Sequence, residues 1–124
     1  MKRVLIVDDQ ADMRRLIRLT LACEPYQVHE AADGTDALRQ ALALQPDLVL
    51  LDVSMPGELD GLQVCARLRG LPALQATRVV LLTARGQAQD RDAGRQAGAD
   101  AYLVKPVSPL QLIETLELLL LPPA

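Results

Sequence analysis

The sequence predicts an α/β fold in which a parallel sheet is covered by helices on both faces. Short runs of Val, Leu and Ile recur along the chain and end at polar residues, as strands buried on both faces do. Segments of helical length separate these runs, and such alternation is typical of a parallel sheet. Strands are expected at residues 4–7, 27–31, 48–51, 79–82 and 102–104, and helices at residues 12–23, 35–44, 61–68, 88–97 and 109–121.

The first strand, VLIV, is followed by a helix whose apolar side chains share one stripe. Its stripe comprises Met13, Leu16, Ile17, Thr20 and Leu21, and its arginines Arg14, Arg15 and Arg18 are expected to face away from the sheet. The second strand, residues 27–31, alternates apolar and polar residues, which indicates a half-exposed edge strand.

Residues that are typical of helix starts and ends support the remaining helix boundaries. Asp33-Gly34 precedes the second helix, and a glycine follows the third helix at Gly70 and the fourth at Gly98. Before the fifth helix, Ser108 and Pro109 have the residue types expected at an N-cap and at the first helical position.

Length and charge limit the classes of function. With 124 residues, half of them hydrophobic, the chain can bury one real core, so we expect residues 1–124 to form a single domain without an effector domain. A net charge of -3 argues against direct binding of nucleic acid through a basic surface.

The cysteines and the apolar runs bear on location. Cys23 and Cys65 lie in apolar helical patterns without metal-ligand spacing, so both are expected to be buried thiols in a reducing compartment. No secretory leader precedes the first strand, and the longest apolar stretch, residues 118–121, is far too short to span a membrane. A cytoplasmic protein is therefore expected.

Polar residues stand where the predicted strands end. Asp8 and Asp9 follow the first strand, Asp52 the third, Thr83 the fourth and Lys105 the fifth. Ligands of open α/β sheets bind outside the carboxyl ends of the strands. If these four strands are neighbours, the five side chains converge on one crevice. Singly, each also has an ordinary interpretation as a helix cap, a strand end or a solvated lysine.

The chemistry of this set points to a metal ion and a phosphoryl group. Three carboxylates about 4 Å apart repel by roughly 4 kcal/mol per pair at an effective dielectric of 20. Lys105 supplies one positive charge, and Mg²⁺, or Mn²⁺ in its place, is a hard cation suited to the oxygens of Asp8, Asp9 and Asp52. Beside a metal, Asp52 can act as a nucleophile toward phosphorus, with Thr83 and Lys105 stabilising the transferred group.

Five stretches together carry a resemblance to a known family. VLIVDDQADMRRLI, PDLVLLDVSMPG, DGLQV, VVLLTA and AGADAYLVKPVSPLQL span nearly the whole chain in this order. They closely resemble the receiver domain of two-component response regulators, including the chemotaxis-regulator type. The resemblance implies a flavodoxin-like, doubly wound fold of five strands in the order 2-1-3-4-5.

The resemblance also implies roles for individual residues. Asp52 matches the phosphoacceptor, and Asp8 and Asp9 match the acidic pair that holds Mg²⁺ together with Asp52 and the backbone carbonyl of Ser54. Thr83 matches the switch hydroxyl that hydrogen-bonds a phosphoryl oxygen, Lys105 matches the lysine that pairs with the phosphate, and Tyr102 matches the aromatic residue that changes rotamer. The resemblance also implies a cis peptide bond between Lys105 and Pro106. The loop MPGELDG is one residue longer than the common family form, so partner contacts there are less defined.

The implied function is a phosphoacceptor switch. Asp52 would take a phosphoryl group from a phosphohistidine on a sensor kinase or phosphotransfer protein, and the domain would turn over only itself, so it is not an enzyme in the usual sense. The face of the fourth helix, last strand and last helix is the expected output surface, for a homodimer or a downstream domain. A phosphorylation-independent receiver that acts as a protein-binding scaffold is the alternative, although the residues whose loss marks that class are all present.

Two other classes fit less well. A haloacid-dehalogenase-like phosphatase also uses an aspartate nucleophile, but its D-x-D pattern needs a second acid that Asp52-Val53-Ser54 lacks. A dinucleotide-binding domain needs glycines after the first strand, and VDDQADM has none.

Overall fold

The computed structural model describes residues 1–84 and 88–121, and it confirms the predicted alternation of strands and helices. The strands form one parallel sheet in the order β2-β1-β3-β4-β5. The strands are β1 (Lys2–Val7), β2 (Tyr26–Ala31), β3 (Leu48–Asp52), β4 (Arg78–Thr83) and β5 (Ala101–Val104). The helices are α1 (Ala11–Thr20), α2 (Gly34–Leu44), α3 (Gly61–Arg69), α4 (Ala88–Gln96) and α5 (Pro109–Leu119), with a 3-10 turn, η1 (Pro72–Leu74).

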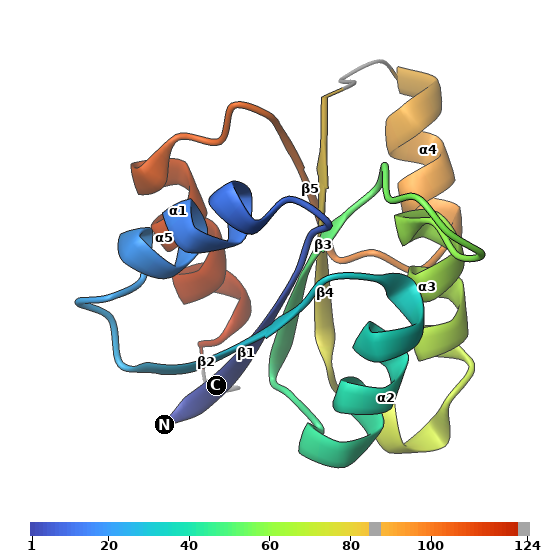
Figure 1. Ribbon diagram of the computed structural model, residues 1–124, viewed down its shortest axis with the longest axis horizontal. Coiled ribbons are helices and arrows are strands. Elements are labelled where there is room, and N and C mark those ends of the chain that lie inside the picture. The colour runs from blue at the N-terminus through green and yellow to red at the C-terminus, as the bar shows by residue number, and fades with distance from the viewer. Residues whose placement is uncertain (85–87, 122–124) are drawn as a thin grey trace.

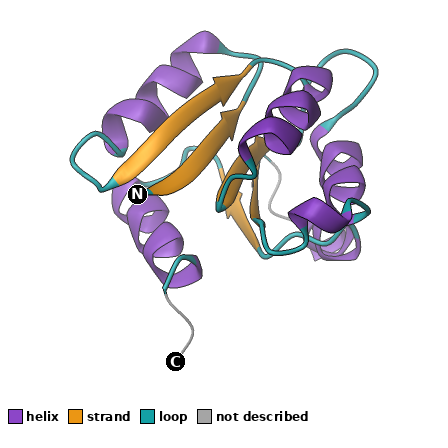
Figure 2. Ribbon diagram, turned by 90° about the horizontal axis from the view of Figure 1, so that it is seen from below, coloured by secondary structure: helices purple, strands orange, loops and turns teal. Residues whose placement is uncertain are grey.

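The helices cover the sheet on both faces, α1 and α5 on one side and α2, α3 and α4 on the other (Figures 1 and 2). Successive residues of a strand point to opposite faces, and β1 shows the consequence. Val4 and Ile6 belong to the core beneath α1 and α5, whereas Leu5 and Val7 belong to the core beneath α2 and α3. Both faces of the central strands are therefore buried, which explains their uninterrupted apolar sequences.

The register of the sheet brings the strand ends to one edge. Val7 pairs with Leu51, so the residues after β1 lie beside the last residue of β3. Thr83 pairs with Val104, which places the end of β4 beside the end of β5. The polar residues that follow these strands are consequently neighbours although they are far apart in sequence.

The predicted caps hold, but the first, fourth and fifth helices end earlier than expected, at Thr20, Gln96 and Leu119. Asp33 and Ser108 accept hydrogen bonds from backbone N–H groups at the starts of α2 and α5. The first helix ends at Thr20 and not at residue 23, so Cys23 lies in the following turn and is exposed, contrary to the sequence prediction. Cys65 is buried as predicted, and burial raises the pKa of its thiol to about 11.

Leu16 also departs from the predicted apolar stripe of α1, because its side chain is 55% exposed whereas Ile17 and Leu21 are buried. In residues 1–84 and 88–121, no helix has the length and apolar character needed to cross a bilayer.

The connection from β3 to α3 is tight, and Gly61 makes it possible. The Gly61 N–H donates to the carbonyl of Val53, and a Cβ on Gly61 would lie 2.1 Å from the carbonyl oxygen of Asp52. The obstacle is backbone, which cannot move aside as a flexible side chain can. Any residue larger than glycine would therefore displace the segment that carries Asp52.

We expect Gly61→Ala to lower the free energy of unfolding by about 2 kcal/mol or more, because it overpacks a site bounded by backbone. Gly70→Ala is the matched control, since a Cβ there meets nothing closer than 3.5 Å and the residue has a right-handed helical conformation. It should change stability by less than about 1 kcal/mol. Urea unfolding measures both variants, and equal losses would contradict the packing explanation.

Candidate functional site

Three carboxylates meet at the edge where the strands end. Asp8 and Asp9 follow β1, Asp52 ends β3, and each contributes an oxygen within 4.8 Å of the others. Asp8 is fully buried and Asp52 is 4% exposed, whereas Asp9 is open to solvent. The predicted convergence of these acids is therefore what the fold produces.

Lys105 enters the same site from the loop after β5. Its Nζ lies 3.1 Å from Asp8 Oδ2 and 3.2 Å from Asp52 Oδ1, so one ammonium bridges both buried carboxylates. The Lys105-Pro106 bond is cis, as the resemblance implied.

The charges in this cluster do not balance. Burial, and then the charge of Asp8, raise the pKa of Asp52 above its ordinary value, while Lys105 and the Ser54 N–H act against this rise. Burial lowers the pKa of Lys105, but the hydrogen bond to Asp8 and the charge of Asp52 outweigh it and raise the pKa. Among residues 1–84 and 88–121, Lys105 is the one cation that forms salt bridges with these acids, so the described part of the site retains a surplus of negative charge that a divalent cation would offset.

Asp52 is oriented by the backbone that follows it. The Ser54 N–H donates to Asp52 Oδ1 at 3.2 Å, the same oxygen that faces Lys105. This leaves the second oxygen, Oδ2, outside that contact. Ser54 is exposed beside the acids, which is compatible with the carbonyl role that the resemblance implied.

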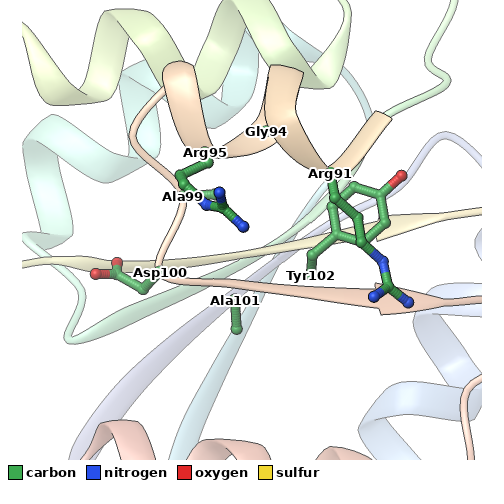
Figure 3. A pocket seen from close by; sticks show the side chains of 7 residues that line it. All are labelled: Arg91, Gly94, Arg95, Ala99, Asp100, Ala101 and Tyr102. Atoms are coloured by element: carbon green, nitrogen blue, oxygen red, sulfur yellow. The ribbon is translucent and has the colours of Figure 1, made fainter. Parts of the chain in front are cut away.

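Thr83 ends β4, the strand next to β3, and Tyr102 lies on β5. Thr83 is buried at the end of β4, and it lines a cavity of about 290 Å³ together with Tyr102, Ser54 and Asp90. A second cavity, of about 260 Å³, lies between α4 and β5 and is also lined by Tyr102 (Figure 3). Space is thus present at two places around the Tyr102 side chain.

Gly94 of α4 makes the packing against Tyr102 possible. A Cβ at Gly94 would lie 2.9 Å from Leu81 Cδ1 and 3.3 Å from Tyr102 Cδ2. Figure 3 shows Gly94 on the turn of α4 above β5, on the side where Tyr102 projects. The helix can approach the strand closely because this position has no side chain.

Comparison with known proteins assigns the chain to a family. The sequence profile of the response regulator receiver domain matches residues 4–117. The chain belongs to this family. This receiver domain is 42% identical over 118 residues to the transcriptional regulatory protein ResD of Bacillus subtilis, a match that covers 95% of this chain and 48% of ResD. The chain therefore spans about half the length of the curated relatives it matches.

Solved structures agree with this assignment. The chemotaxis protein CheY4 of Vibrio cholerae superposes with a TM-score of 0.91 at 33% identity, over 97% of this chain and 99% of that one. A putative response regulator from Chloroflexus aurantiacus J-10-fl gives a TM-score of 0.90 at 36% identity, over 95% of this chain and 96% of that one. The flavodoxin-like fold with strand order 2-1-3-4-5 is thereby confirmed.

In this receiver domain, Arg14 does not face away from the sheet as its place on α1 predicted. Its Nη1 donates to the carbonyl oxygen of Asp8 at 2.7 Å, and its Nε contacts Glu30 Oε1 of β2 at 3.1 Å. Arg18 also turns toward β2, with Nε 2.8 Å from Glu30 Oε2. The prediction was wrong because the edge strand lies against that side of α1 and offers a carboxylate.

The loop between β3 and α3 contains a second feature that the sequence prediction missed. Asp60 accepts a hydrogen bond from the Gln63 N–H, and the Gln63 side chain accepts one from the Asp60 N–H. This reciprocal capping box was visible in the sequence as Asp60-Gly-Leu-Gln63. It fixes the start of α3, so the long loop returns to the sheet at a defined point.

The ion pairs of Glu30 with Arg14 and Arg18 should make part of the free energy of unfolding depend on pH. Burial raises the pKa of Glu30, but hydrogen bonds from Arg18 and Arg14 outweigh it and hold the pKa below its ordinary value. A lowered folded-state pKa contributes stability above the unfolded value of about 4.3, and this contribution is lost as the pH falls through the folded pKa.

We therefore expect Glu30→Gln to cost up to about 1 kcal/mol near neutral pH, since these pairs are partly solvated. The difference from wild type should shrink toward zero in acid, once the pH lies below the lowered folded-state pKa and Glu30 is protonated in both states. Urea unfolding at the two pH values measures this, with Glu58→Gln at an exposed loop position as the control. A difference that persists in acid would show that the ion pairs are not its source.

Proposed function

We propose that this receiver domain is the phosphoacceptor switch of a two-component phosphorelay and that Asp52 accepts the phosphoryl group. One observation carries the proposal: Asp52 is a buried carboxylate at the carboxyl edge of the sheet, within reach of two further acids and of the Lys105 ammonium. A structural aspartate would gain nothing from two acidic neighbours, whereas a phosphoryl-transfer site needs them to hold a cation.

The proposed chemistry is displacement at phosphorus. A carboxylate oxygen of Asp52 forms the new P–O bond as the P–N bond of a phosphohistidine breaks, and the histidine nitrogen keeps the electron pair. Lys105 stabilises the negative charge on the phosphoryl oxygens, and Thr83 offers a hydroxyl at the neighbouring strand end. Attack of water on the acyl phosphate later restores the carboxylate, so the domain turns over only itself.

The donor set fits Mg²⁺, with Mn²⁺ as a substitute. Asp8, Asp9, Asp52 and the carbonyl of Ser54 would hold the ion with hard oxygen ligands, as Mg²⁺ prefers, and the surplus negative charge of the site favours it. When bound, the ion supplies positive charge that neutralises the oxygens of the transferred group.

The proposed switch connects Asp52 to the face of α4, β5 and α5. Thr83 would move toward the phosphoryl group, and Tyr102 would change rotamer in the space beside it. To shift a population from 1:99 to 99:1 requires a differential of about 5.5 kcal/mol between the two states. Charge-assisted bonds from Lys105 and Thr83 could supply a large part of it.

The proposed partners follow from this chemistry. The donor is a phosphohistidine on a sensor kinase or phosphotransfer protein, and the output is a second copy of the domain or a downstream domain. Leu110 and Leu118 of α5 are 64% and 70% exposed, which supports a protein contact on this helix. ResD is named as a transcriptional regulatory protein, so we propose that the output of this domain is in transcription. We also propose that the domain acts in the cytoplasm and, being acidic, does not itself contact DNA.

Incubation with Mg²⁺ and acetyl phosphate should add a single phosphoryl group to the chain. Intact-mass spectrometry should detect the adduct in wild type and not in Asp52→Ala, because Asp8, the other buried acid of the cluster, already has both carboxylate oxygens in hydrogen bonds, to the Gln10 N–H and to Lys105 Nζ. Asp92→Asn on the exposed face of α4 is the control and should be phosphorylated as wild type is. An adduct that survives Asp52→Ala would overturn the assignment of the acceptor.

Binding of Mg²⁺ should depend on Asp9, the exposed acid of the cluster. Asp9→Asn removes one ligand charge without leaving a buried group unpaired, so the variant should fold and bind Mg²⁺ about tenfold or more weakly, since 1.4 kcal/mol of lost attraction is enough for that factor. Asp12→Asn, an exposed acid in the first turn of α1, should bind nearly as wild type does. Isothermal titration calorimetry measures both, and equal affinities would remove Asp9 from the site.

A further inference from the structure

The Asp8 residue is held at each of its polar groups. Its N–H donates to the Ala31 carbonyl at 3.2 Å, and its side-chain oxygens accept from the Gln10 N–H at 2.9 Å and from Lys105 Nζ at 3.1 Å. Its carbonyl oxygen accepts from Arg14 Nη1 at 2.7 Å. The last of these contacts comes from a side chain that the phosphoryl-transfer chemistry does not use.

Arg14 is itself fixed from the other side. Its side chain is 18% exposed, and its Nε is 3.1 Å from Glu30 Oε1 on β2. Glu30 is in turn held by Arg18 through Oε2, and its carbonyl accepts from Gln40 Nε2 of α2 at 2.8 Å. The Arg14 guanidinium therefore connects the edge strand β2 to the turn after β1, with a contact on each side.

The peptide plane that Arg14 holds is the one that joins Asp8 to Asp9. Asp9 is exposed, and its carboxylate has no hydrogen-bond donor among the residues that the structure describes. Among those residues, none fixes the direction of this side chain through a hydrogen bond or an ion pair. The orientation of the preceding peptide, with its carbonyl on Arg14, is thus what determines where the Asp9 carboxylate can reach.

We infer that Arg14 is a positioning residue for the divalent cation: by binding the Asp8 carbonyl it directs the Asp9 carboxylate toward Asp8 and Asp52. The inference rests on the proposed function, because it concerns the same cation site. Outer residues that orient metal ligands typically affect metal affinity by about 10- to 100-fold when they are changed.

Charge and geometry predict opposite effects for the loss of Arg14. A positive charge near a cation site repels the ion, so its removal alone should strengthen Mg²⁺ binding. Removal of a positioning residue should weaken binding, because the Asp9 carboxylate then samples directions away from the site. The sign of the change in affinity therefore separates the two roles.

The test is Mg²⁺ affinity by isothermal titration calorimetry without any phosphodonor, on the full chain. Arg14→Gln should bind Mg²⁺ about tenfold more weakly than wild type. Arg15→Gln is the matched control, because it deletes the same charge one position along α1 from an exposed side chain, and it should bind as tightly as wild type or slightly more tightly. Arg14→Lys keeps the charge and one donor without the two-sided fork, so its affinity should lie between wild type and Arg14→Gln.

The melting temperature of each variant is measured by circular dichroism, and the Mg²⁺ affinities are compared well below the lowest of these temperatures. Under that condition, a substitution that only lowers the stability of the fold leaves the Mg²⁺ affinity unchanged. If Arg14→Gln does not fold, weaker Mg²⁺ binding by Arg14→Lys than by wild type, which carries the same charge, supports the inference, and equal binding overturns it. Equal or tighter binding by Arg14→Gln overturns the inference alone. A wild type that binds no Mg²⁺ overturns the proposed function as well.

Discussion

Lys105 places one ammonium between two buried carboxylates, Asp8 and Asp52, with a third acid, Asp9, beside them in solvent. Burial strengthens every electrostatic interaction in this cluster, both the attraction to Lys105 and the repulsion between the acids. The lysine arrives on the loop after β5 and the acids at the ends of β1 and β3, so the cluster exists only when the whole sheet is formed. The two apolar cores that enclose β1 and β3 offset its cost and hold its parts in place.

Most of the fold could be predicted because the central strands are buried on both faces. A strand such as β3, which is buried on both faces, has to be apolar along residues 48–51, and the polar residue Asp52 then marks its end. The strand order came from the resemblance to receiver domains and not from periodicity, since burial alone does not say which strands are neighbours. Helix ends were less certain because Leu21 and Cys23 continue the pattern of α1 after its backbone has left the helix.

The positions of the three acids, Thr83 and Lys105 at the carboxyl ends of the strands could be predicted, because each is a polar residue that follows or ends an apolar run. Arg14 could not, because helical spacing groups it with Arg15 and Arg18 on the polar side of α1, and only the position of β2 turns it inward toward Glu30 and Asp8. The space around Tyr102 was equally hidden, since it arises from the close approach of α4 at Gly94. Contacts of this kind depend on how elements lie against each other, which a pattern within one element does not contain.

Anomalous diffraction from crystals grown with Mn²⁺ tests most directly whether the surplus charge of this pocket recruits a cation. The account predicts one strong anomalous peak at coordination distance from carboxylate oxygens of both Asp9 and Asp52. A pocket without such a peak at millimolar Mn²⁺, or a Mn²⁺ ion bound only at acids elsewhere on the surface, would contradict it.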